Sequence, residues 1–126
     1  MAESQQSMEL DIKRIKSRDF ALRIINLYRF LIDKRAYEIG KQILRCGTSI
    51  GANVAEAECS ESDSDFIHKL AIALKEANET EYWLDLLWRS ELITTQQYES
   101  LNEDCVELIK ILKSIINSMK QKKSLT

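Results

Sequence analysis

Residues 63–90 decide the fold, and they read DSDFIHKLAIALKEANETEYWLDLLWRS. The stretch contains neither proline nor glycine, and apolar side chains recur along it at the three- and four-residue spacing of one helix face. That stripe consists of Phe66, Leu70, Ala73, Leu74, Ala77, Leu84 and Trp88. Ser62 precedes the stretch and Asp65 lies three residues further on, a pattern typical of a capped helix N-terminus. The pattern therefore predicts one long helix over residues 63–90.

Three more segments carry the same periodicity, and they are predicted to be helices over residues 17–34, 36–57 and 95–121. Ser17 is the expected N-cap of the first, and a threonine in the turn 91–95 is the expected cap of the last. The chain has 126 residues with no proline and three glycines, so few residues are suited to turns. Long helices joined by such short links pack as antiparallel neighbours.

These observations predict an all-α fold, an antiparallel up-down-up-down four-helix bundle over residues 17–121. Residues 1–16 are expected to form a partly disordered lead-in, and residues 122–126 a disordered tail. A chain of this length buries one core without disulfide or metal support. The prediction is therefore a single domain.

The composition argues against several classes of protein. Cys46, Cys59 and Cys105 are odd in number and lack the CxxC spacing of a zinc site, so we expect three reduced thiols. The N-terminus lacks the apolar segment of a signal peptide. The sequence contains no run of about 18 apolar residues, so no membrane span is predicted. We expect a cytoplasmic protein that has no cofactor. His68 is the only histidine and is expected to be exposed, so neither a di-iron bundle nor another catalytic site is predicted.

Charge is distributed unevenly along the chain, although the net charge is only −2. Residues 1–45 and 106–126 each carry a net +4, while residues 46–105 carry −10. The basic ends predict contacts to a nucleic acid, or else complementary packing between helices or between subunits. The candidate nucleic-acid contacts are Lys13, Arg14, Lys16, Arg18, Arg23, Lys120, Lys122 and Lys123.

The first and third predicted helices carry more apolar residues than one buried face needs. The surplus residues are Leu22, Ile25, Ile72, Tyr82, Trp83 and Leu86, which fall roughly opposite the core stripes. Large apolar side chains outside the core are typical of a protein–protein interface. We interpret them as an interface between copies of this chain; the alternative is that Tyr82 and Trp83 only cover loops or lie scattered on the surface.

The second predicted helix contains GTSIGANVAE over residues 47–56, with two glycines four residues apart. Such a pair permits close contact between helices or marks a kink. Ser49, Asn53 and Glu56 form a polar ridge beside the core stripe, and we assign them, with Glu79 of the third helix, to an inter-helix network that fixes register. The alternative is that the ridge is a functional site.

These residues also carry a family resemblance. The stretch from Ser49 to Glu56 resembles the S-I-x-x-N-[IV]-A-E motif of four-helix bundle proteins named after intervening sequences of 23S rRNA genes. Residues 66–73, 79–84 and 92–94 resemble the opening of the third helix in that family, its acidic-aromatic centre and its last turn. Ala57 stands where the family usually has glycine, which predicts that the second helix runs on toward Cys59.

The resemblance implies a homo-oligomeric ring, with a pentamer favoured, and no enzymatic activity. The surplus apolar residues and the lack of a predicted catalytic site favour a scaffold or adaptor that binds another protein. A related bundle is the accessory protein of diversity-generating retroelements, which binds a reverse transcriptase and nucleic acid through a strongly basic surface. The present chain has a pI of about 5.5. Nucleic-acid binding through the chain ends is therefore the second hypothesis.

Overall fold

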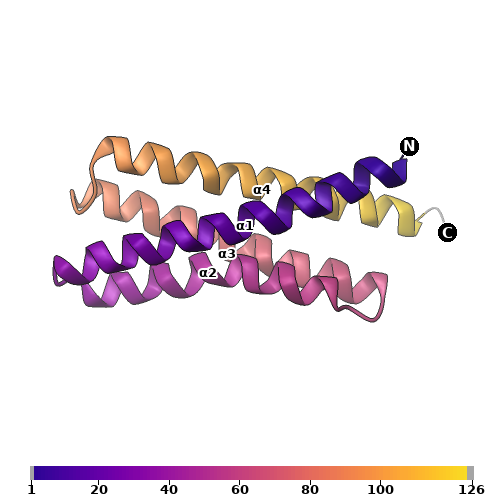
Figure 1. The fold of residues 1–126 in the computed structure, drawn as a ribbon, viewed down its shortest axis with the longest axis horizontal. Coiled ribbons are helices and arrows are strands. Elements are labelled where there is room, and N and C mark those ends of the chain that lie inside the picture. Colours follow the sequence, from indigo (N-terminus) through magenta and orange to yellow (C-terminus); the bar gives the residue numbers. More distant parts are fainter. Residues whose placement is uncertain (1, 125–126) are drawn as a thin grey trace.

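The computed structural model describes residues 2–124, and the side chains of residues 11–124. They form four helices, α1 (Ala2–Asp33), α2 (Tyr37–Glu58), α3 (Asp63–Arg89) and α4 (Thr95–Ser124). Successive helices run up and down the long axis, and both ends of the chain lie at the same end of the bundle (Figure 1). The predicted all-α four-helix bundle is confirmed.

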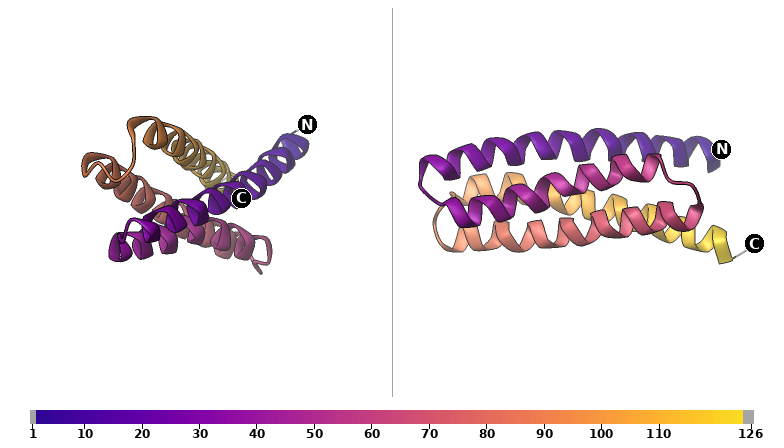
Figure 2. Two further views of the ribbon diagram at one scale, coloured as in Figure 1. Left: turned by 60° about the vertical axis from the view of Figure 1, so that its left-hand side comes forward. Right: turned by 90° about the horizontal axis from the view of Figure 1, so that it is seen from below.

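Each helix packs on two others, so the four neighbouring pairs form a closed cycle. The right-hand view of Figure 2 shows α1 lying along α2, and α2 along α3. The neighbouring pairs are α1–α2, α2–α3, α3–α4 and α1–α4, of which α1–α4 has the least extensive contact. In the described part of the chain, the backbone of α1 does not come close to that of α3, nor the backbone of α2 to that of α4. The outer sides of α1 and α3 therefore face in opposite directions.

The core lies between all four helices and follows the predicted stripes. Ile24, Ile50, Leu84 and Leu112 supply one fully buried side chain from each helix. Burying a side chain of this size contributes about 1.5–3 kcal/mol, so the four stripes are the main source of stability. Cys105 belongs to the same core, and burial raises the pKa of its thiol to about 12. All three cysteines are free thiols.

The turns use polar caps and left-handed residues in place of glycine. Arg35 and Glu91 follow α1 and α3 with φ angles of 62° and 65°. After each of them the chain donates a backbone hydrogen bond five residues back, from Ala36 N to Leu31 O and from Leu92 N to Leu87 O. This pairing is the Schellman motif, which usually has glycine at the left-handed position. The chain thus reverses direction after α1 and after α3 without a glycine, and the left-handed backbone at each turn costs only a modest conformational free energy.

The predicted helix caps are present at the other helix ends. The Ser62 hydroxyl accepts a hydrogen bond from Asp65 N at 3.1 Å, which starts α3. Thr94 and Gln97 cap α4 reciprocally, because each side chain accepts from the backbone N–H of the other, at 3.1 and 2.9 Å. The second helix does extend past Ala57, and Cys59 is its C-cap.

The predicted start of the first helix at Ser17 is wrong, because α1 begins at Ala2 and includes most of the expected lead-in. Ser17 is 1% exposed, and its hydroxyl donates to Arg14 O at 3.2 Å inside the helix. No helix breaker occurs between residues 2 and 17, and the buried face continues backwards from Phe20 through Ser17 to Lys13. Likewise α4 continues to Ser124; residues 125–126 of the expected tail lie outside the described residues.

Candidate interaction surfaces

The glycine pair of α2 sets how closely α1 lies against it. A Cβ atom on Gly47 would come within 2.7 Å of Ile24 Cγ1, and one on Gly51 would come within 3.3 Å of the backbone oxygen of Ser17. Only glycine allows the first of these contacts, since real Cβ atoms essentially never approach to 2.7 Å. The glycines therefore mark close helix contact, one of the two predicted roles. They fix the position of α1 and of its outer face.

The polar ridge does not form the single network that we predicted. Ser49 donates from its hydroxyl to Arg45 O at 2.6 Å, and Asn53 donates from Nδ2 to Ser49 O at 2.8 Å, so both bond within α2. Glu56 reaches α3 through an ion pair with Lys69 at 3.1 Å. The ridge is thus satisfied locally because a helix offers its own carbonyl oxygens four residues back.

Glu79 belongs to a different cluster, which sequence reasoning missed. The Arg45 guanidinium pairs with Glu76 at 3.2 Å and also with Glu79, and it holds the pKa of the Glu79 carboxyl below its usual value. Trp83 donates from Nε1 to the same carboxylate at 3.3 Å. This cluster ties α2 to α3. The available signal was the pair Glu76 and Glu79, spaced so that one arginine on a neighbouring helix can reach both.

The residues predicted to form an oligomer interface lie on two separate faces. Leu22 on α1 and Tyr82 on α3 are the most open of them, each 57% exposed. The half-buried members are Ile25 on α1 and Ile72, Trp83 and Leu86 on α3. The rings of Tyr82 and Trp83 meet edge to face with centroids 5.2 Å apart. The structure thus brings the α3 residues together and keeps them away from those of α1.

The apolar face of α1 is longer than predicted. Ile15 is 59% exposed and Ile12 39% exposed, and they extend the line of Leu22 by two turns toward the N-terminus. Sequence reasoning missed them because it began the helix at Ser17. We call Ile12, Ile15, Leu22 and Ile25 the α1 face, and Ile72, Tyr82, Trp83 and Leu86 the α3 face.

Most of the α1 residues proposed to contact nucleic acid already contact side chains of other helices. Arg14 pairs with Glu58 at 2.7 Å, Arg23 pairs with Asp104 at 2.6 Å, and Lys16 forms an ion pair with Glu107. Lys13 is 1% exposed, with its ammonium 5.4 Å from the centre of the Phe66 ring.

Burial lowers the pKa of Lys13, and the nearby Glu58 partly opposes that shift. At the other end of the chain, Lys123 contacts the Ser64 hydroxyl. Arg18, Lys120 and Lys122 are exposed. The N-terminal basic residues therefore largely join helices, the second of the readings that their charge allowed.

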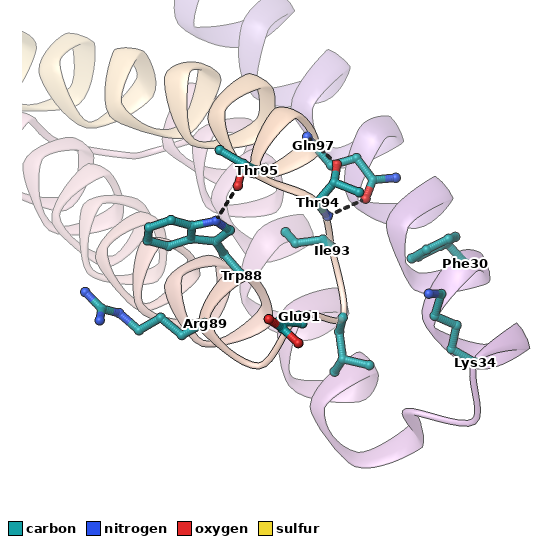
Figure 3. Close-up of a pocket in the computed structure, with 10 residues that line it drawn as sticks. Phe30, Lys34, Trp88, Arg89, Glu91, Ile93, Thr94, Thr95 and Gln97 are labelled. Atoms are coloured by element: carbon teal, nitrogen blue, oxygen red, sulfur yellow. Dashed lines mark hydrogen bonds between the residues drawn. The ribbon is translucent and has the colours of Figure 1, made fainter.

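A cleft of about 660 Å³ opens beside the turn between α3 and α4 (Figure 3). Phe30 of α1 and Lys34, the residue after α1, line one side, and Trp88, Ile93 and Thr94 lie across from them. Its polar groups largely bond to one another: Trp88 donates from Nε1 to Thr95 Oγ1 at 3.0 Å, and Thr94 is engaged with Gln97. The lining residues include no histidine or cysteine.

The comparison with known proteins agrees with the four-helix fold described above. The model of the 23S rRNA-intervening sequence protein family matches residues 9–114. The chain belongs to this family. In this 23S rRNA-intervening sequence protein, the motif at residues 49–56 lies in α2 and includes Gly51, where an added Cβ atom would come within 3.3 Å of the Ser17 backbone oxygen.

A solved structure of a family relative has the same fold. The protein comes from Bacteroides thetaiotaomicron and is described as having unknown function and belonging to the S23 ribosomal protein family. It is 57% identical to this 23S rRNA-intervening sequence protein, over 86% of this chain and 98% of that chain, with a TM-score of 0.85. A comparison with curated proteins finds no match.

Among residues 2–124 no three His, Cys, Asp or Glu side chains are grouped as metal ligands would be. None of the four helices, as far as they are described, has the length and apolar character needed to cross a membrane.

Proposed function

We propose that the protein is a non-catalytic scaffold that assembles into a homo-oligomeric ring, with a pentamer favoured, and presents that assembly to another protein. The observation that carries the proposal is the pair of apolar faces on α1 and α3. Leu22, Ile15 and Tyr82 each expose more than half of their surface. Large apolar residues gathered on one side of a helix are typical of a binding surface.

The arrangement of the two faces supports a ring. Because α1 and α3 are diagonal in the bundle, the α1 face and the α3 face point in opposite directions. If the α1 face of one copy binds the α3 face of the next, each copy has two neighbours. Such a head-to-tail contact closes into a ring or continues as a filament, whereas a twofold dimer would leave one face uncovered.

Charge on the two helices favours the same contact. The helix α3 contains six acidic and three basic residues, while α1 contains six basic and five acidic residues. Opposite net charges on two facing helices favour encounter and discourage pairing of like faces. The nucleic-acid alternative has weaker support, because Arg14, Lys16 and Arg23 already pair with carboxylates of the same chain.

Sedimentation velocity of the purified chain tests the proposal. We expect an oligomer at micromolar concentration in wild type, and smaller species in Leu22→Asp and in Tyr82→Asp, because each substitution buries a charge in the apolar contact. Gln42→Asp, an exposed position on α2, is the matched control and is expected to behave as wild type. A stable wild-type monomer under these conditions would rule the proposal out.

A further inference from the structure

The outward face of α4 changes its charge half-way along the helix. This face consists of Glu99, Glu103 and Glu107 in the first half, and Lys110, Lys113 and Lys120 in the second half. The spacing places them on one side of the helix, away from its buried residues such as Leu108 and Leu112. All are exposed except Glu107, which is half-buried. One helix side therefore presents an acidic block followed by a basic block.

Little inside the protein balances these charges. Glu107 pairs with Lys16, but Glu99, Glu103, Lys110, Lys113 and Lys120 form no ion pair with any side chain of residues 11–124. Within the helix the order is unfavourable, because like charges spaced four apart repel each other, as Glu99 and Glu103 do. The helix dipole accounts only for charges in the first and last turns. Glu103 and Lys113 lie well inside the helix, so their order has no local explanation.

We propose that this face binds the same face of a second copy, with the two α4 helices antiparallel. A twofold axis beside residue 108 would place Glu103 opposite Lys113 of the second copy. The same register would bring Glu107 near Lys110 of that copy. Because the axis repeats every contact, each opposite-charge pair occurs twice, as in any isologous interface.

Charge balance favours a second copy over a polyanion such as a nucleic acid. The face has three carboxylates and three ammonium groups, so its acidic half would repel phosphates while its basic half attracts them. The face also lacks large exposed apolar residues among residues 95–124. Its contact is therefore mainly electrostatic, which makes it weak and sensitive to salt. It is separate from the apolar contact between the α1 and α3 faces. It can therefore join two single chains, or two rings that have already assembled through those faces.

Charge exchange tests this contact by sedimentation velocity of the full chain in about 25 mM and about 500 mM NaCl, since the higher salt shortens the screening length severalfold. We expect wild type to form a larger species only in low salt. Glu103→Lys and Lys113→Glu each place like charges opposite each other twice, and we expect each to weaken the low-salt association by about tenfold or more. The double variant Glu103→Lys with Lys113→Glu restores both pairs and is expected to regain it.

Controls separate this contact from other sources of association. Lys41→Glu makes the same change on the exposed side of α2 and is expected to leave the low-salt species intact. Far-ultraviolet circular dichroism checks that each variant keeps its helix content. Any oligomer that remains in high salt reports the apolar contact of the α1 and α3 faces, so the two proposals fail independently.

Two results would overturn the α4 pairing. One is association that does not differ between the two salt concentrations in wild type. The other is loss of association in Lys113→Glu without recovery in the double variant. A parallel titration with fluorescein-labelled duplex DNA and structured RNA in low salt identifies the rival occupant: binding that Lys113→Glu abolishes and the double variant fails to restore would assign the lysines to nucleic acid instead.

Discussion

Helix α1 contacts its two neighbours in opposite ways. Against α2 it packs at the closest distance that side chains allow, with Ile24 lying over Gly47. Against α4 the contact is less extensive, and two ion pairs bridge it, Arg23 with Asp104 and Lys16 with Glu107. The first seam depends on shape, and at Gly47 it has no room for an added atom. The second depends on flexible charged side chains, so it tolerates change.

The difference shows which residues set the position of α1. Exposed ion pairs contribute little to stability, usually below about 1 kcal/mol each. Close apolar packing contributes more and is disturbed by a single methyl group. The seam with α2 therefore positions α1 and its outer face, and the seam with α4 adjusts to it. The following substitutions test this contrast, from the largest expected effect to the smallest.

Gly47→Ala should destabilise the protein by about 2 kcal/mol, because the added methyl group overlaps with a buried, β-branched Ile24 that has no free rotamer to adopt. Urea unfolding followed by circular dichroism measures the effect. Ile24→Ala should cost less on the Gly47→Ala background than in wild type, because it removes Cγ1 and Cγ2, the two Ile24 atoms that the added methyl group would meet below 3 Å. A Gly47→Ala protein as stable as wild type would show that α1 and α2 can move apart enough to accept a methyl group.

Lys13→Met should stabilise the protein by about 1 kcal/mol at neutral pH, because it removes the cost of burying an ammonium group while keeping the volume. The pKa of Lys13 is lowered in the folded state, so the unfolded chain holds its proton more tightly. Wild-type stability should then rise as the pH passes through that lowered pKa toward 10.5. Thermal unfolding of both proteins across this range should show the difference between them shrinking as the pH rises.

Gly40→Ala provides the matched contrast to Gly47 on the same helix. A Cβ atom there would lie 3.6 Å from its nearest neighbours, Leu31 and Tyr28, which is ordinary contact. Alanine favours the helix by about 0.8–1 kcal/mol over glycine, so this variant should be more stable than wild type. A rise in the urea midpoint with an unchanged m-value is the expected result, and a fall would mean that α1 also packs too tightly here to accept a methyl group.

Arg23→Ala should cost only about 0.5 kcal/mol, and Lys16→Ala should have only a slight effect, since both ion pairs are exposed to solvent. The loss should shrink further when salt is raised, because screening weakens the pair in wild type. Urea unfolding at low and high salt measures both the loss of stability and its dependence on salt. A cost equal to that of Gly47→Ala would remove the contrast between the two seams.

Much of the fold follows from the sequence because helix periodicity is a local signal. The stripes led by Phe20, Ile43, Leu70 and Leu101 all face the core, and Ser62 caps α3 as its spacing with Asp65 predicts. The start of α1 escaped prediction because its buried face there continues through Lys13 and Ser17, which pattern reading counts as polar. A lysine can be buried when its stem packs against apolar groups.

The candidate surfaces were predictable only in part. The surplus apolar residues of α1 and α3 could be found from their angular positions around each helix. Their separation onto opposite sides of the bundle follows from the order in which the helices pack. The partner of Glu79 could not be found, because Arg45 reaches it from 34 residues away in the sequence. Long side chains choose their partners in three dimensions, which a single sequence does not specify.

The most direct test of the account mixes two chains, each blocked on one apolar face. Leu22→Asp leaves the α3 face intact, and Tyr82→Asp leaves the α1 face intact, so neither should assemble alone. Together they should form a one-to-one complex, because one good face remains on each chain and the two are complementary. Native mass spectrometry of the mixture in about 500 mM ammonium acetate measures this, because that salt screens the α4 contact. A heterodimer is the predicted result, and two unassociated variants, or a variant that still assembles alone, would contradict the head-to-tail contact.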